Sequence, residues 1–205
     1  TKLDLASNYA FTGTVTGAGS LKLVHTTSLT PTSAVSSISV TSVFTSSYNT
    51  YLIVLTDLTV NGDGTSNNNL TFKLLNSGGS PITSQIDYIG RLHTRGGSPS
   101  DYGGGSQTSV ACAVNVYGDT ASPICGYMWL YNPLKNDSRR NFIAHFNNLN
   151  NGAVSSRMYT QGILMGSGGT HTAVHGIEFL AGGNATQING ANSTYTSSLK
   201  IYGVS

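Results

Sequence analysis

Residues 44–58 read FTSSYNTYLIVLTDL, and this run of sequence decides the fold. Val, Leu, Ile, Thr and Tyr crowd the run, and a sequence rich in Asn and Gly closes it at residues 61–64. Residues of these types favour a β-strand over a helix. The dense apolar side chains of the run are Tyr51, Ile53, Leu55 and Leu58. Their density predicts a central strand inside a two-layer β structure, covered on both sides for part of its length.

The composition indicates a polar surface with few charges. The chain has 205 residues, a length that suits one all-β domain and allows a sizeable core. Only 9% of the residues are charged, against roughly 25% in typical soluble domains, and Ser, Thr, Asn and 25 Gly take their place. A formal net charge of +2 provides no long-range field, so we expect neither nucleic acid nor an anionic membrane as a partner.

Membrane insertion is not expected either. No apolar run approaches the roughly 20 residues that a bilayer-spanning helix needs. The first residues also lack the basic and apolar regions of a signal peptide. We therefore expect the chain, as given, to be soluble.

Short segments in which apolar and polar side chains alternate recur along the chain, and no window of about ten residues keeps an apolar stripe at helical spacing. The predicted strands, besides the one in residues 44–58, cover residues 21–29, 34–44, 69–75, 84–93, 107–117, 124–131, 141–146, 154–165, 174–180 and 198–204. This spacing predicts an all-β fold over residues 21–205, a β-sandwich of the jelly-roll type. Residues 1–20 carry too little apolar mass for a core and are expected to form an extended N-terminal arm or attachment segment.

The segment TRGGSPSDYGGGS, residues 94–106, is rich in Gly, Ser and Pro and is predicted to be a long mobile loop without regular structure. Loops of this length in compact domains often bind ligands or partners. An aromatic ring beside polar side chains is a common platform for sugars. We therefore take Tyr102, together with Asp101 and Arg95, as the candidate ligand-binding residues. The alternative is a long hairpin connection without a binding role.

The two cysteines, Cys112 and Cys125, lie on consecutive apolar runs. If these runs pair as a hairpin, a cross-strand disulfide is geometrically possible. Their small and apolar neighbours favour the other interpretation, in which both are buried free thiols. The two cysteines therefore do not decide between an oxidising and a reducing compartment.

Two segments contain residues that can bind metal ions. His171 and His175 are an even number of positions apart in an extended segment, so both can face the same side, but no third ligand is near in the sequence. Surface or interface histidines are the alternative. Residues 61–69 carry oxygen ligands as in a calcium loop, but they lack the acidic residue that closes an EF-hand, and a hairpin turn of this composition needs no ion. We therefore expect no metal and no cofactor.

The sequence contains no recognisable catalytic motif. No pair of carboxylates stands out as in glycosidases, and Glu178 alternates with Ile177 and Phe179 as an outward strand residue. No Gly-x-Ser-x-Gly elbow is present, and residues 166–169 read as a turn. We therefore expect no enzyme activity and no catalytic residue, and depolymerase activity is the minor hypothesis.

Three segments carry a resemblance to phage structural proteins of tail fibres, head fibres and receptor-binding modules. The first is FTSSYNTYLIVL, residues 44–55, which is similar to the F-x-S-x-Y-D-N-Y start of those domains, with Asn49 and Thr50 in place of Asp and Asn. The second is LYNP at residues 130–133, a strand that ends in Asn-Pro. The third is GIEF at residues 176–179, which leads through a loop of Gly, Asn and Thr to LKIYGV in the last predicted strand.

The run AFTGTVTGA at residues 10–18 also resembles the segment that precedes many virion fibre modules. The resemblance implies a homotrimeric virion component with a jelly-roll domain, whose exposed loops can contact a host cell-surface glycan or other virion structural proteins of the capsid or tail. The expected function is a trimeric fibre-type module that contacts the host surface during adsorption. A capsid decoration or cement protein without receptor binding is the alternative.

Overall fold

The computed structural model describes residues 21–30, 34–61, 68–83, 85–117, 122–136, 140–149, 154–164, 172–188 and 196–204. Within these residues the chain is all-β, as predicted, and there is no helix that could cross a membrane. The strands in chain order are β1 (Leu21–Leu29), β2 (Ser37–Val40), β3 (Thr50–Leu58), β4 (Val60–Asn61), β5 (Asn68–Leu75), β6 (Ile86–Thr94), β7 (Ser100–Gln107), β8 (Val110–Val116), β9 (Ile124–Tyr131), β10 (Arg140–Leu149), β11 (Ser155–Leu164), β12 (Gly176–Gly183), β13 (Gln187–Ile188) and β14 (Ser197–Val204).

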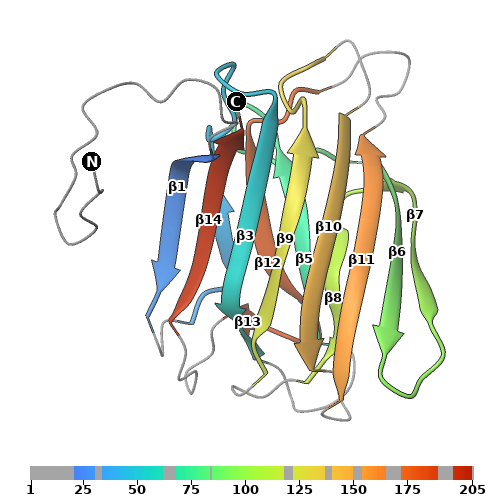
Figure 1. The fold of residues 1–205 in the computed structure, drawn as a ribbon. Helices are drawn as coiled ribbons and strands as arrows, with labels where there is room; N and C mark the ends of the chain where they lie inside the picture. The colour runs from blue at the N-terminus through green and yellow to red at the C-terminus, as the bar shows by residue number, and fades with distance from the viewer. Residues whose placement is uncertain are drawn as a thin grey trace, which may run out of the picture.

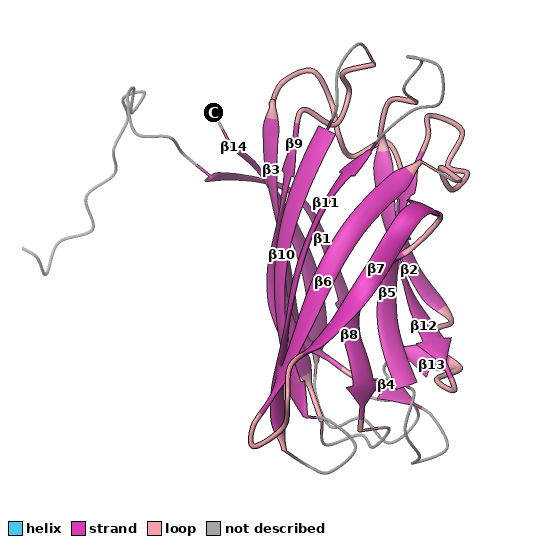
Figure 2. Ribbon diagram, turned by 90° about the vertical axis from the view of Figure 1, so that its right-hand side faces the viewer, coloured by secondary structure: helices cyan, strands magenta, loops and turns pink. Residues whose placement is uncertain are grey.

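The strands form two antiparallel sheets that face each other, as Figure 1 and Figure 2 show, and this arrangement confirms the β-sandwich. The large sheet has eight strands in the order β1-β14-β3-β9-β10-β11-β6-β7. The small sheet has four strands in the order β2-β12-β5-β8, and β13 pairs with β4. The jelly-roll topology stays a prediction, and the predicted arm, residues 1–20, lies outside the described residues.

The core lies between the two sheets, because the strands alternate inward and outward side chains. On β3, which is an interior strand as predicted, the inward residues Tyr51, Ile53 and Leu55 are fully buried. The outward residues Leu52 and Val54 are only half-buried. The expectation that β3 is covered on both sides is therefore wrong for the isolated chain, because the small sheet covers one face and leaves the other open.

Four of the residues that carry the fibre resemblance, from its first segment and from the last strand, pack together at one end of β3. Phe44 and Tyr48 contact the ring of Tyr51 edge to face, with ring centroids 4.8 and 5.8 Å from it. The ring of Tyr48 also lies against Gly203 of β14, where an added Cβ would be only 2.3 Å from Tyr48 Cδ2. The glycine in the last strand is therefore required by the close approach of this ring.

The prediction of a loop at residues 94–106 is wrong for most of this range, because Ser100–Gln107 form the edge strand β7. β7 pairs with β6 through main-chain hydrogen bonds, and this pairing needs no bulky side chains on β7. At Gly103 the φ angle is 136°, and an added Cβ would lie 2.2 Å from the carbonyl oxygen of Tyr88. Glycine therefore permits this strand pairing, although the same composition predicted a loop.

The two cysteines do not lie on one hairpin. Cys112 is on β8 in the small sheet, Cys125 is on β9 in the large sheet, and both thiols are free. Cys112 is buried as predicted, whereas Cys125 is half-buried. Burial raises the pKa of the Cys112 thiol well above its ordinary value. Burial also raises the pKa of Cys125, although a hydrogen bond from the N–H of Asp57 to its sulfur (3.3 Å) acts in the opposite direction.

Candidate functional site

The outward face of the large sheet carries exposed apolar side chains. Directly paired residues of antiparallel strands point to the same face, so the register assigns each side chain. One row of paired residues crosses the sheet from β1 to β6: Leu23, Tyr202, Leu52, Trp129, Ile143, Gln161 and Ile89. Among the described residues, the large hydrophobic side chains with exposed fractions from 37% to 55% all lie on this face: Leu21, Leu23, Ile89, Tyr127, Ile143 and Tyr159. The exposed large apolar side chains of the described residues are therefore concentrated on one face of the sandwich.

One half of this face, over β1, β14, β3 and β9, is predominantly apolar. A shallow groove of about 620 Å³ runs over β3 and β9. We call the following outward residues the apolar half: Leu21, Leu23, Leu52, Val54, Tyr127, Trp129, Tyr202 and Val204. Lys200 brings a positive charge among them, opposite Val54. The remaining side chains offer apolar and aromatic contact area.

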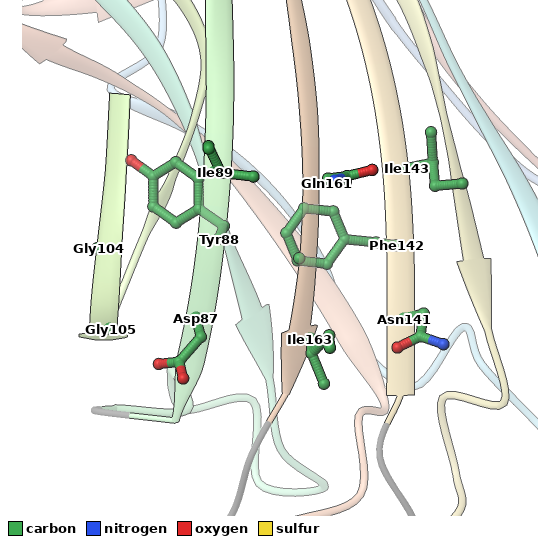
Figure 3. A pocket seen from close by; sticks show the side chains of 11 residues that line it. Asp87, Tyr88, Ile89, Gly104, Gly105, Asn141, Phe142, Ile143, Gln161 and Ile163 are labelled. Carbon is green, nitrogen blue, oxygen red and sulfur yellow. The ribbon is translucent and has the colours of Figure 1, made fainter. Parts of the chain in front are cut away.

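The other half of the face, over β10, β11 and β6, mixes polar and apolar side chains around a hollow of about 580 Å³ (Figure 3). One outward row that borders it consists of Asn141, Ile163 and Asp87. The next outward row consists of Ile143, Gln161 and Ile89. Polar and apolar side chains therefore alternate in both directions across the sheet. We call this cavity the mixed hollow.

Three glycine residues line the mixed hollow. Gly162 lies between Phe142 and Tyr88 in the row of paired residues that separates the two outward rows. An added Cβ at Gly162 would point inward and lie 2.4 Å from Phe142 Cζ, so the packing of that buried ring requires glycine here. At the edge of the sheet, Gly104 and Gly105 of β7 also line the hollow without filling it.

The carboxylate of Asp87 is held in place at the rim of the mixed hollow. Its Oδ1 atom accepts a 2.6 Å hydrogen bond from the N–H of Ser106 on β7. The neighbouring Gln107 donates through Nε2 to the carbonyl oxygen of Gly105 at 2.8 Å, which ties the same end of β7 together. A carboxylate has two acceptor oxygens, so Asp87 can bond to Ser106 and still accept hydrogen bonds from a ligand.

A second hollow of about 270 Å³ continues from the mixed hollow along the strands. The two hollows share Ile89, Ile143 and Gln161. In the second hollow, Tyr159 lies between His145 and His93, with ring centroids 4.5 and 5.8 Å away in edge-to-face geometry. This arrangement fixes an exposed tyrosine ring beside polar groups. We call the two hollows together the mixed groove.

The structure does not bring the three predicted ligand-binding residues together. Asp101 lines the second hollow and forms an exposed ion pair with Arg91 (3.7 Å). Tyr102 packs against a small buried cluster, which we call the inner cluster and which consists of Leu92, Ala111, Val114 and Met158. Its hydroxyl accepts a 3.3 Å hydrogen bond from Asn115 Nδ2. Arg95 lines a third hollow at the end of β6, which adjoins the second hollow at Tyr159. Of the three, only Asp101 contributes to the mixed groove.

The structure describes only part of the two segments that contain possible metal ligands. His171 and residues 62–67 of the calcium-type loop lie outside the described residues. His175 precedes β12, and its main-chain N–H donates to the carbonyl oxygen of Leu75 at 2.8 Å. In the part of the chain that the structure describes, no group of three or more His, Cys, Asp or Glu side chains is placed to hold a metal ion.

The sequence analysis missed the residues that give the mixed groove its polar and aromatic character: Asp87, Asn141, Tyr159 and Gln161. Each lies at an outward position of a strand that the alternation of side chains predicted. The signal was therefore present within each strand. Whether the side chains of β6, β10 and β11 come together depends on the register between these strands, which a single sequence does not specify.

Comparisons with known proteins do not assign the chain to a family. No protein-family model matches it, and no curated protein does. Among solved structures, it has a weak similarity to a fructofuranosidase from Schwanniomyces occidentalis complexed with fructose, with 13% sequence identity and a TM-score of 0.25. The alignment covers 90% of this chain and 34% of that chain. A TM-score this low carries no argument about fold or activity.

Proposed function

We propose that the chain is a trimeric fibre-type module of a phage virion that contacts the host surface during adsorption. The observation that carries this proposal is the concentration of exposed apolar side chains on one face of the large sheet. A face of this kind favours a role in contact with other molecules. The resemblance of residues 44–55 and of the last strand to virion fibre modules supports the particular class of contact protein.

The apolar half is the surface that we assign to contact between copies of the chain. Interfaces of homo-oligomers are more apolar than the average surface, and interface cores are enriched in aromatic residues. Tyr202, Leu52 and Trp129 lie side by side in one row, and such a cluster suits the centre of an interface. Three copies around one axis would form a closed assembly, with the apolar half of each chain turned toward the axis.

The mixed groove is the surface that we assign to contact with the host. Its polar side chains, Asp87, Asn141 and Gln161, suit a face that stays in water until a ligand binds. Binding of this kind requires no catalytic group, so the proposed module acts by adhesion and not as an enzyme. Other virion proteins are the remaining partners, and the virion is the proposed location.

Two measurements test the proposal. Static light scattering of the purified chain at micromolar concentration should give the mass of three chains, and the mass of one chain would contradict the trimer. Immunoelectron microscopy with an antibody against the chain should label fibres on phage particles from a lysate that contains it. Label spread over the capsid shell, with no binding of the purified chain to host cells, would support the capsid decoration alternative instead.

A further inference from the structure

We propose that the mixed groove binds a neutral oligosaccharide. The proposal deepens the host contact described above and rests on it, because a surface glycan would be the ligand through which the module reaches the cell. Three features of the groove carry it: the pattern of polar groups, the sign of the charges, and the length of the cavity.

The pattern of side chains matches the chemistry of a sugar. A pyranose presents hydroxyl groups at its edge and C–H groups on its faces. Asn141 and Gln161 offer amides that both donate and accept hydrogen bonds, and Asp87 offers a carboxylate acceptor fixed by Ser106. Both amide side chains are exposed and therefore available to a ligand.

Apolar groups stand between these polar groups, where the faces of sugar rings would pack. Ile163 separates Asn141 from Asp87 in one row, and Gln161 lies between Ile143 and Ile89 in the next row. In the second hollow, the exposed ring of Tyr159 provides an aromatic surface of the kind that stacks on sugars.

The charges favour a neutral ligand over an anionic one. Asp87 places a negative charge at the rim of the mixed hollow, where it would repel a phosphate or a sialic acid carboxylate. Arg91 is already paired with Asp101 at 3.7 Å. Arg157 donates to the hydroxyl of Tyr159 at 3.3 Å and lines an adjoining hollow that shares Tyr159 with the second hollow. Its charge therefore borders the mixed groove at the end opposite Asp87, and the first sugar ring near Asp87 meets only the negative charge.

The length of the groove favours an oligosaccharide over a single sugar. From Asp87 in the first hollow to Arg91 in the second, β6 advances four residues, which is roughly 14 Å of extended strand. Asp87 and Asn141 are two strand spacings apart, about 10 Å across the sheet. This space admits more than one ring, with the first near Asp87 and a later one against Tyr159.

A glycan array probed with the labelled full chain tests the proposal. The array carries neutral oligosaccharides of glucose, galactose, mannose and N-acetylhexosamines beside sialylated ones. Calorimetric titration with the neutral oligosaccharide that gives the strongest signal then compares variants. Asn141→Ala and Gln161→Ala should each weaken binding about tenfold, because each removes hydrogen bonds to the ligand. Neither should lower the melting temperature, since both side chains are exposed.

Asn147→Ala is the matched control. Asn147 is the same residue type on the same strand and the same face as Asn141, and it is also exposed, but it pairs with Cys125 and Arg157 outside the mixed groove. Its substitution should leave the affinity within about twofold.

Three results would overturn the proposal: no neutral glycan bound by the unmodified chain, a preference for sialylated glycans, or equal effects of Asn141→Ala and Asn147→Ala. None of them would alter the mass of the assembly or its location on the virion. Failure of this inference is therefore distinguishable from failure of the proposed function.

Discussion

The phenol oxygen of Tyr51 accepts a 2.8 Å hydrogen bond from the N–H of Thr45 and donates a 2.9 Å hydrogen bond to the carbonyl oxygen of the same residue. One buried side chain thus satisfies both main-chain groups of a residue in the turn before β3. The first residue of that turn is therefore fixed to the strand that follows the turn. This contact explains why a tyrosine, and not another aromatic residue, suits the position.

Replacement of Tyr51 by Phe should lower the free energy of unfolding by about 1–3 kcal/mol, because it removes two hydrogen bonds to the main chain of Thr45. Urea unfolding followed by tryptophan fluorescence measures this change. Tyr131→Phe removes the same hydroxyl from a half-buried outward tyrosine that is not part of the apolar half, and it should change the free energy by less than about 0.5 kcal/mol. Equal effects of the two substitutions would show that the Thr45 hydrogen bonds contribute nothing.

The contact between Tyr48 and Gly203 predicts a coupled pair of substitutions. Gly203→Ala should destabilise the fold by about 1–3 kcal/mol, because the new Cβ would lie 2.3 Å from the Tyr48 ring. Tyr48→Ala removes that ring, so the double variant should be less destabilised than the sum of the two single variants. Thermal or urea unfolding of the four proteins measures the coupling, and simple additivity would contradict the contact.

The buried thiol of Cys112 predicts a dependence of stability on alkaline pH. Burial raises its pKa, so the folded state keeps a proton that the unfolded state loses above about pH 8.5. The raised pKa of Cys112 therefore leaves the folded state fully stable below that pH, and the free energy of unfolding decreases as the pH rises above it. Cys112→Ala should therefore flatten the fall in stability between about pH 8.5 and 10. Urea midpoints across this range test it, and parallel curves for the two proteins would contradict it.

The proposed contact between copies predicts that one charge on the apolar half separates the trimer. Leu52→Lys would bury an ammonium group in the interface of every subunit, at a cost of several kcal/mol. The variant should therefore show the mass of one chain in light scattering at micromolar concentration. Ser39→Lys is the control, because Ser39 is exposed on the small sheet. A trimer that survives Leu52→Lys would place the interface elsewhere.

The alternation of side chains was a reliable guide to most of the strands. The predicted ranges 21–29 and 124–131 coincide with β1 and β9, because each keeps an uninterrupted β-type sequence between clear turns. The predicted strand at residues 34–44 is reduced to Ser37–Val40. The short strands β4 and β13 were not predicted, since two residues each leave no periodic signal.

The candidate site was less accessible from the sequence. Tyr102 was selected for its glycine-rich neighbours, but these glycines form an edge strand that turns the ring toward the inner cluster. Asp87 and Gln161 have unremarkable sequence neighbours and acquire a shared environment only when β6 pairs with β11. Pairing between strands that are distant in the chain is a property of the whole fold, so local composition does not reveal it.

The position of β14 between β1 and β3, seen in Figure 1, limits when the large sheet can be completed during protein synthesis. A ribosome makes β1 and β3 early, but β1 pairs only with β14 among the described strands, and residues 197–204 are translated much later. Until they emerge, β1 has no neighbour and one edge of β3 is open to other chains. The nascent chain must therefore wait for β14 before this side of the sandwich can fold, and it is exposed to mispairing and to chaperones during that interval.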